Sequence, residues 1–210
     1  MDFFETINTR KTIRKYKPDM PDMDDVRKII DAARVAPSAT NSQNWQFIVI
    51  KNKNILEKMK NTVINEYDKL AELNTEEEFL EKISYFKSYS TFFVNAPIVI
   101  AIVETKRVSY ITEMMKKLNF DNEKLKYMRP DSSLLSIGGA IENMSLAAHN
   151  LGYGTCWMVA PIIATEEFSK LLNLDNDSHV VSLLPLGIPY RDDYQSPPKK
   201  TLEEVIKIID

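Results

Sequence analysis

The chain has 210 residues, and its 44% hydrophobic and 27% charged content favours a folded globular protein over a disordered one. Its 27 basic and 30 acidic residues give a net charge of -3, which excludes an overall field that would attract nucleic acid or acidic lipid. The single cysteine, Cys156, excludes an intrachain disulfide and a zinc site built on paired cysteines. We expect a cytoplasmic protein, because the longest apolar run, Ala96 to Val103, is too short to cross a bilayer and Met1 to Glu5 do not begin a signal peptide.

Helical spacing of apolar residues predicts four helices in the first half of the chain. The residues that define them are Phe3, Phe4 and Ile7; Val26, Ile29, Ile30 and Ala33, which follow a cap at Asp22; Ile55, Leu56, Met59, Val63 and Ile64; and Phe79, Leu80, Ile83 and Phe86. Two apolar runs, Trp45 to Ile50 and Ala96 to Val103, predict buried strands.

The second half predicts a variable insert followed by a long apolar helix. Residues 104–130 have only partial helical periodicity, and we interpret them as a mobile helical insert. From Asp131 to Leu151 few positions are polar, so we expect a helix that is buried nearly all round and stops at Gly152. Glycine costs about 1 kcal/mol against alanine inside a helix, so Gly138 and Gly139 predict a close approach by another element.

Two more strands are expected around Thr155 to Val159 and Val180 to Leu186, and Thr201 with Glu204 form a capping-box pattern near the C-terminus. No stretch is rich enough in Pro, Gly or Ser to be a linker, and no repeat is present, so we expect residues 1–210 to form one domain. Because helices outnumber strands and do not alternate regularly with them, the class is α+β.

The first candidate site is the basic segment Arg10-Lys11-Thr12-Ile13-Arg14-Lys15. In an extended conformation Arg10, Thr12 and Arg14 would share one side. Two guanidinium groups and a hydroxyl suit a phosphate, because charge-assisted hydrogen bonds are strong and arginine binds phosphate through two donors. The alternative is a solvated basic turn, since short basic runs are common on protein surfaces.

The second candidate is the polar loop from Ala36 to Trp45, which lies between the second helix and the first strand. Its amides and hydroxyls could pair with the edge of a planar heterocycle, and Pro37 would hold the loop rigid and supply an apolar wall. The alternative is an ordinary connection that uses Ser and Asn for its turns.

The third candidate is the segment from Gly152 to Pro161, in which glycines precede an apolar strand that ends at a proline. Backbone groups at such a strand end could face a ligand, and the alternative is a buried strand that leaves a helix through a glycine turn. Lys199 and Lys200 add a late cationic pair, which is most often only solvent-exposed.

Several chemistries lack the residues that they require. The five glycines form neither a dinucleotide-binding G-x-G-x-x-G motif nor a P-loop. His149 and His179 lie 30 residues apart without an acidic cluster, which argues against a metal site, and the apolar neighbours of Cys156 indicate an inert thiol. A phosphate site and a ring-binding loop without catalytic side chains indicate that a bound cofactor would carry out the chemistry.

In this order, four segments resemble the nitroreductase family of FMN-dependent NAD(P)H oxidoreductases. They are Arg10 to Arg14, Ala36 to Trp45, Leu151 to Trp157 and Leu184 to Pro189, and together they span nearly the whole chain. The resemblance implies an α+β fold with a central mixed sheet flanked by helices, an intertwined homodimer, and FMN at the subunit interface. It also makes the helix from Asp131 to Leu151 the main dimer contact.

The resemblance assigns cofactor-binding residues but no catalytic side chain and no metal, since N5 of the flavin is the reactive centre. Arg10, Lys11, Thr12 and Arg14 match the first flavin-binding motif and would hold the phosphate and ribityl chain, with Lys199 as a later partner. Residues of the polar loop would reach the flavin of the other subunit, and a strand end would lie beside the ring. These are Pro37, Ser38, Ala39, Asn41 and Gln43 in the loop, and Trp157, Met158, Val159 and Ala160 at the strand end.

Three positions depart from the family's pattern. Asn44 stands where the family usually has proline, and Lys199 stands where arginine is common. Val159-Ala160 stands where Glu-Gly or Gly-Gly is frequent. The last departure affects the contacts near N5. Residues 104–130 correspond to the family's variable region over the active site, where substrate preference is set.

The resemblance implies that NAD(P)H reduces FMN and leaves, after which a nitro compound, quinone or similar small acceptor takes two electrons. Two alternatives stay open. One is a family dehydrogenase or desaturase whose substrate is not a nitro compound, and the other is an FMN-binding storage or sensing module without turnover. The sequence does not choose between NADH and NADPH.

Overall fold

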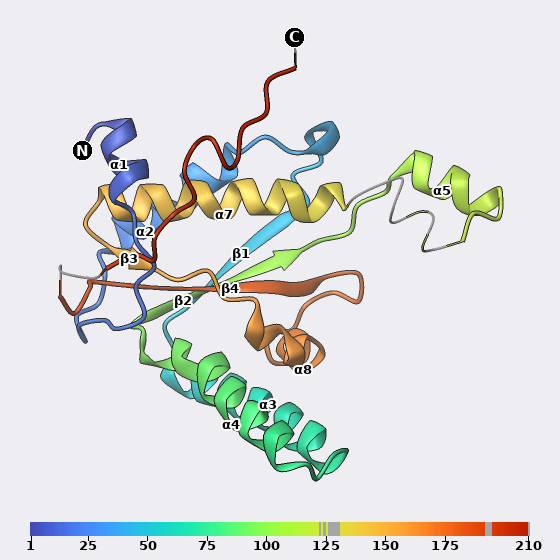
Figure 1. Ribbon diagram of the computed structural model, residues 1–210, viewed down its shortest axis with the longest axis horizontal. Coiled ribbons are helices and arrows are strands. Elements are labelled where there is room, and N and C mark those ends of the chain that lie inside the picture. The colour runs from blue at the N-terminus through green and yellow to red at the C-terminus, as the bar shows by residue number, and fades with distance from the viewer. Residues whose placement is uncertain (122, 124, 126–130, 192–194, 210) are drawn as a thin grey trace.

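The computed structural model describes residues 1–121, 123, 125, 131–191 and 195–209. Its centre is an antiparallel sheet in the order β1-β2-β4-β3, with helices on both faces (Figure 1). The strands are β1 (Trp45–Ile50), β2 (Ile98–Glu104), β3 (Gly154–Thr155) and β4 (His179–Gly187). The α+β class with a sheet flanked by helices is confirmed. The parallel pairing of the expected mixed sheet is limited, in the described residues, to one bridge between Thr12 and Thr155.

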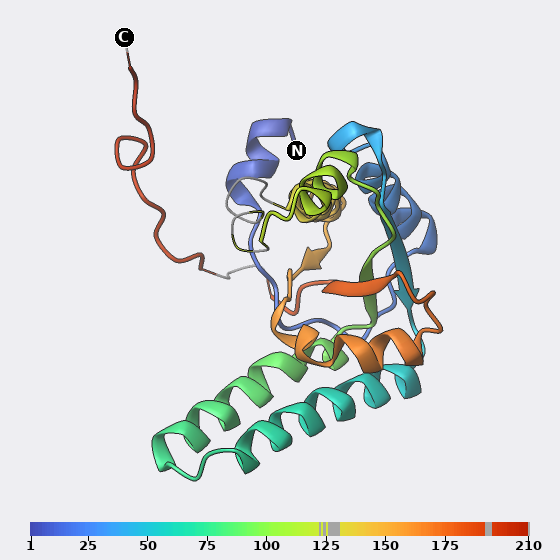
Figure 2. The same ribbon diagram turned by 90° about the vertical axis from the view of Figure 1, so that its right-hand side faces the viewer.

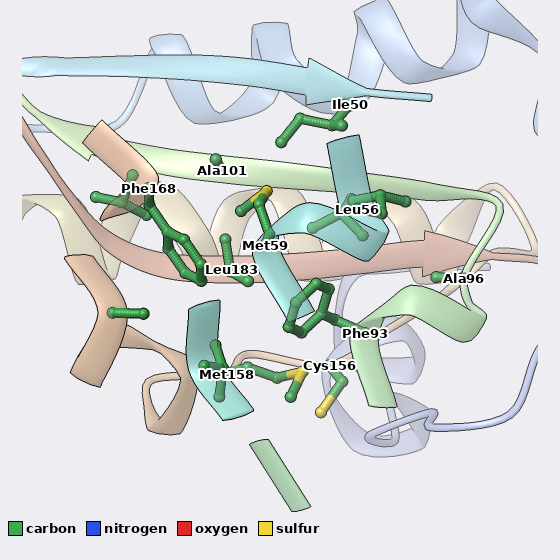
Figure 3. Packing of buried hydrophobic residues seen from close by; sticks show 14 of the residues in the cluster. Ile50, Leu56, Met59, Phe93, Ala96, Ala101, Cys156, Met158, Phe168 and Leu183 are labelled. Atoms are coloured by element: carbon green, nitrogen blue, oxygen red, sulfur yellow. The ribbon is translucent and has the colours of Figure 1, made fainter. Parts of the chain in front are cut away.

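Two apolar clusters lie on opposite faces of the sheet, and the alternating side chains of β2 contribute to both. Val99, Ala101 and Val103 belong to the cluster beneath α3 (Lys53–Glu72), α4 (Glu77–Thr91) and α8 (Thr165–Leu171), part of which is shown in Figure 3. Ile98, Ile100 and Ile102 belong to the cluster beneath α2 (Met23–Arg34) and α7 (Ser132–Asn150). This double burial explains why β2 is apolar at nearly every position.

The predicted helices are present, and their caps explain their boundaries. The Asp22 side chain accepts a hydrogen bond from the Asp24 N–H and begins α2, and Asp131 does the same for Ser133 and Leu134 at the start of α7. The opening helix α1 (Phe3–Thr9) begins with a capping box between Asp2 and Glu5. The sequence did not predict α8 or the short 3-10 helices that precede it and follow α4.

Two strand predictions need correction. Among the described strands β1 lies at the edge beside β2, and it is mostly half-buried, so it is not the buried strand that its composition indicated. β3 ends at Thr155 instead of continuing to Val159. The Cys156 N–H donates to the Pro185 carbonyl, but proline has no N–H to return the bond, so the ladder breaks there and resumes as an isolated bridge at Met158.

The expected burial of α7 on all sides is also wrong for the single chain. Leu134 and Leu135 are exposed, Leu135 to 70% of its surface, although the opposite side of the helix is buried. A Cβ atom at Gly138 would lie 3.4 Å from the Trp157 ring, which is ordinary contact with a side chain, and a Cβ at Gly139 would have no neighbour within 4 Å. The described part of the single chain therefore does not contain the close backbone approach that we predicted.

Two peripheral segments stand away from the sheet. Part of the expected 104–130 insert forms α5 (Tyr110–Lys117), but residues 122, 124 and 126–130 of that insert lie outside the described residues. The described part of the C-terminal tail, 195–209, is exposed and extends away from the body (Figure 2). In it Thr201 donates to the Glu204 carboxylate, so the capping-box pair closes a turn and no helix follows. No helix in the described part of the chain is long and apolar enough to cross a membrane.

Candidate functional site

The basic segment is extended and joined to β3 through its backbone. The Ile13 N–H donates to the Thr155 carbonyl at 2.9 Å, and Thr12 forms a parallel bridge with Thr155. Gly154 makes this approach possible, because a Cβ atom there would lie 2.5 Å from the Ile13 side chain. The expected extended conformation is therefore present, and it places Arg10, Thr12 and Arg14 next to the strand end.

Arg10 has an incompletely paired guanidinium group. Its Nε lies 3.6 Å from Oε1 of Glu142 on α7. The Arg10 Nε is buried and has no hydrogen-bond acceptor among the described residues. A buried donor without a partner costs about 1–3 kcal/mol, so such a group calls for an explanation. An anion bound by the guanidinium group would offset this cost, and a phosphate fits both the charge and the donors.

The charges of this segment perturb two neighbouring groups. Burial lowers the pKa of His149, and the positive charges of Arg10 and Lys11 lower it further. Burial raises the pKa of the Cys156 thiol, and Arg14 acts in the opposite direction. His149 Nε2 lies 2.9 Å from the hydroxyl of Thr9, which fixes the imidazole against α1. The basic segment therefore creates a local positive potential in a chain whose net charge is negative.

The strand end contributes backbone donors. Met158 packs in the core, and both its N–H and its carbonyl bond to Leu183, so neither its side chain nor its backbone is available to a ligand. Trp157 and Val159 are exposed to 46% and 60%, and Ala160 begins a 3-10 helix. Within the described residues the N–H groups of Val159 and Ala160 have no acceptor. Together with the Trp157 N–H, which also has no acceptor there, these groups are donors in the segment that follows the basic segment's bridge on β3.

The polar loop has a strained backbone. Thr40, Asn41 and Gln43 have φ values of 58°, 51° and 45°, which are unfavourable for residues other than glycine. The Ser38 hydroxyl accepts from the Gln43 N–H at 3.0 Å, and the Ser136 hydroxyl on α7 accepts from the Ala39 N–H at 3.1 Å. Pro37 and Asn41 are exposed. The surrounding hydrogen bonds therefore maintain a conformation that the sequence alone would not favour.

Asn44 holds the end of this loop through a buried network that the sequence analysis did not identify. Its side-chain oxygen accepts from the Ser42 hydroxyl at 2.8 Å, and its Nδ2 donates to the hydroxyl of Ser133 on α7. The Ser133 hydroxyl in turn donates to the Glu104 carboxylate at the end of β2. The departure from the family's proline at position 44 was the available signal, because asparagine adds a donor and an acceptor.

Arg107 was also missed. Its Nη1 donates to the Ser132 hydroxyl at 2.7 Å, and its Nε is buried without an acceptor in the described part of the chain. It lies in the segment between β2 and α5, where weak periodicity gave no reason to single out one basic residue.

Within one chain these groups contact α7 at different points along its length, and the Trp157 ring of the strand end lies between them, beside Gly138. The basic segment and the strand end meet near β3, with Arg10 paired to Glu142. The polar loop contacts Ser133 and Ser136 instead. Ser136 lies six residues before Glu142, a distance of about 9 Å along the helix axis. Lys199 belongs to the exposed C-terminal tail, which extends away from the body (Figure 2).

Comparison with known proteins places this arrangement in a family. Residues 7–188 match the nitroreductase family. A protein of Methanothermobacter thermautotrophicus, provisionally named an NADH dehydrogenase/NAD(P)H nitroreductase, is 28% identical over 191 residues, which cover 90% of this chain and 78% of the relative. The iodotyrosine deiodinase of Nematostella vectensis is 23% identical over 209 residues, which cover 98% of this chain and 74% of the relative.

Two solved structures have the same fold. The BluB-like flavoprotein from Clostridium difficile 630 superposes with a TM-score of 0.89 at 28% identity, over 100% of both chains. A nitroreductase with bound FMN from Bacteroides fragilis NCTC 9343 superposes with a TM-score of 0.70 at 20% identity, also over 100% of both chains. Because the family match extends from residue 7 to residue 188, this chain belongs to the nitroreductase family of FMN-dependent oxidoreductases.

Proposed function

We propose that this chain binds FMN between the subunits of a homodimer and uses NAD(P)H to reduce nitro compounds, quinones or similar small acceptors. The observation that carries the proposal is the joining of the basic segment to β3, which holds Thr12 against Thr155 at the start of the segment that continues to the free N–H groups of Val159 and Ala160. FMN, when bound, supplies the two-electron chemistry that no side chain of the site supplies. No residue is therefore assigned a catalytic role.

The phosphate end of the cofactor fits the basic segment. Arg10 offers a buried Nε without an acceptor among the described residues, and Arg14 adds an exposed cation four residues further along the extended segment. Lys11, the Thr12 hydroxyl and Lys199 complete the proposed phosphate and ribityl contacts, with Lys199 contributing through movement of the tail. Bidentate arginine contacts make a phosphate a better fit than a carboxylate of similar charge.

The flavin ring of the cofactor fits beside the segment from Trp157 to Ala160. The free N–H groups of Val159 and Ala160 would donate to the edge of the ring, and the exposed Trp157 would line it. Met158 would hold this segment in place from the core, since its backbone is bonded to Leu183. The uncommon Val159-Ala160 pair therefore still supplies backbone donors, because an N–H group does not depend on the side chain.

A second copy of the chain would complete the site. Members of the family are typically dimers. In this chain apolar side chains are exposed on three elements that a second copy could cover: Phe3 and Phe4 on α1, Leu135 on α7, and Val205 and Ile208 in the described part of the tail. Because the polar loop contacts α7 at Ser133 and Ser136, about 9 Å or more along the helix from the Glu142 that pairs with Arg10, we propose that Pro37, Ser38, Ala39, Asn41 and Gln43 reach the cofactor of the other subunit.

The decisive experiment removes the phosphate contacts. Purified wild-type protein should be yellow with the absorbance of oxidised flavin, and Arg10→Ala combined with Arg14→Ala should weaken FMN binding at least about 100-fold, since two charged contacts are lost. Arg27→Ala combined with Arg34→Ala is the matched control, because it removes the same charge from two exposed arginines of α2. A colourless wild-type protein that does not bind added FMN would refute the proposal, and so would equal flavin content in both double variants.

A second candidate is reductive dehalogenation. Several relatives are iodotyrosine deiodinases, and they align over 91–98% of this chain. Steady-state assays with a nitroaromatic, a quinone and 3-iodotyrosine, each with NADH, NADPH and dithionite as reductant, separate the alternatives. Release of iodide without nitroaromatic turnover would favour the second candidate, and flavin that is bound but never reduced by NADH or NADPH would favour a binding module.

A further inference from the structure

Arg107 is a cation whose charge is not balanced by a neighbouring acid. Its Nη1 donates to the Ser132 hydroxyl at 2.7 Å, its Nε is buried without an acceptor, and it forms no ion pair within the described residues. The two nearby acids are already used. Asp131 accepts from the N–H groups of Ser133 and Leu134, whereas Glu104 accepts from the Ser133 hydroxyl and lies 3.6 Å from His179.

This arginine is held next to the polar loop by one short stretch of α7. Consecutive serines bond to different segments, since Ser132 accepts from Arg107 and Ser133 accepts from Asn44. One turn later, Ser136 accepts from the Ala39 N–H. Arg107 is therefore fixed on the same two helical turns as the loop that we propose to reach a cofactor.

The surroundings of Arg107 suit a ligand with an apolar body. The segment that follows it exposes Val108 to 55% and Tyr110 to 86%, so exposed apolar and aromatic side chains occur within three residues of Arg107 in the sequence. A guanidinium group held by a hydroxyl keeps donors free for a planar carboxylate, which it binds through two parallel hydrogen bonds. A buried arginine donor without an acceptor is the kind of group for which a missing anion is a physical explanation.

We propose that Arg107 binds the carboxylate of an aromatic acid, and that the electron acceptor of this enzyme belongs to that class. The inference rests on the proposed function, because it places the acceptor above a flavin beside the polar loop. Arg107 is the residue that selects the anionic acceptor, and Ser132 orients it. The phosphates of NAD(P)H are a second source of anionic oxygens, and the experiment below distinguishes them from the acceptor.

Binding of a non-reducible probe tests the inference without relying on turnover. Flavin-loaded protein is titrated with benzoate and with its neutral analogue benzamide by calorimetry. The Kd for benzoate should rise about 10- to 100-fold in Arg107→Gln and less in Arg107→Lys, while the Kd for benzamide stays the same. Lys106→Gln is the matched control, because the Lys106 ammonium group pairs with Asp177 at 2.7 Å and its loss should leave the binding of benzoate unchanged.

Turnover gives a second measurement on the same variants. With 4-nitrobenzoate as acceptor, Arg107→Gln should raise KM by a similar factor and leave kcat nearly unchanged, whereas both constants for nitrobenzene should stay at their wild-type values. Equal affinity of wild type and Arg107→Gln for benzoate would overturn the inference. A raised KM for NADH or NADPH with unchanged benzoate binding would also overturn it, because the anion would then belong to the dinucleotide.

Folding and cofactor controls keep the two proposals distinct. If Arg107→Gln does not fold, Arg107→Lys decides, since it keeps the charge and loses the planar pair of donors. Protein that binds FMN and reduces nitrobenzene but shows no effect of Arg107 on benzoate would refute only this inference. Protein that binds no FMN would refute the proposed function and this inference with it.

Discussion

The two ends of α7 hold their neighbours by different means. At the C-terminal end the basic segment is joined to β3 by backbone pairing, and the fit depends on the absence of a side chain at Gly154. At the N-terminal end serine side chains hold the polar loop and Arg107, and the loop backbone is strained. Backbone pairing fixes a segment whatever its side chains are, whereas side-chain hydrogen bonds position particular groups. The first end contains the proposed phosphate contacts, and the second contains the polar loop and the proposed acceptor contact at Arg107.

The largest expected effect comes from disturbing the backbone-paired end. Gly154→Ala would place a Cβ atom 2.5 Å from the Ile13 side chain, closer than atoms can pack, so the basic segment must move off β3. We expect a loss of about 3 kcal/mol in the free energy of unfolding, together with weaker FMN binding. Urea denaturation and flavin titration measure both effects. Unchanged stability would show that Ile13 can move freely and that the pairing is not rigid.

The serine-held end should respond almost as strongly to the loss of one hydroxyl. Ser133→Ala leaves Asn44 and Glu104 without their shared partner in a buried position, and we expect a cost of about 1–3 kcal/mol in stability. Ser145→Ala is the matched control, because this buried serine of the same helix bonds only to the Ile141 carbonyl, one turn earlier. If both variants lose the same stability, the Asn44 network contributes nothing beyond an ordinary helical serine.

The same contrast explains what the sequence could predict. Helix and strand positions follow from apolar spacing and caps, which are local, so β1, α2 and α7 were located to within one or two residues. The early end of β3 was missed because it depends on Pro185, which lies 29 residues further along the chain, opposite Cys156.

The candidate site shows the same division. The basic segment was identifiable because its charges and hydroxyl adjoin in sequence. Asn44, Ser133 and Arg107 were not, because each acquires its role only from a partner on another element. The exposed side of α7 was mispredicted for a related reason, since an apolar helix looks the same in sequence whether its own chain or a second copy covers it.

Gly139 lies between the two ends and tests the proposed dimer. A Cβ atom at this position would meet nothing within 4 Å among the described residues of its own chain, so we attribute a loss of dimer affinity in Gly139→Leu to contact with a second copy. We expect the dissociation constant of the dimer to rise at least about tenfold, which corresponds to about 1.4 kcal/mol. Sedimentation velocity over a dilution series measures it, with Lys58→Leu on the exposed surface of α3 as the control. A monomeric wild type, or an unaffected variant, would argue against α7 as the dimer contact.

The smallest expected effect concerns the charge state of His149 at the backbone-paired end. Burial first, and then Arg10 and Lys11, lower its pKa below the ordinary value of 6.5, so the folded protein binds this proton less readily than the unfolded chain does. Between the two pKa values the unfolded state carries more protons, and stability therefore falls as the pH drops below about 6.5 and stops falling below the lowered pKa.

His149→Gln should reduce this pH dependence in flavin-free protein, because glutamine does not titrate and could still hydrogen-bond to Thr9. Flavin-free protein is required, since a phosphate bound at Arg10 would attract the imidazolium and oppose the effect of the arginine. Urea denaturation of wild type and variant between pH 5 and pH 8 (about 1.5 pH units on either side of the ordinary value) measures the difference. His179→Gln, which alters the histidine beside Glu104, is the control. If the free energy of unfolding of wild type and His149→Gln depends on pH in the same way, the positive potential of the basic segment does not reach α7. The electrostatic argument for a phosphate at the basic segment would then lose its support.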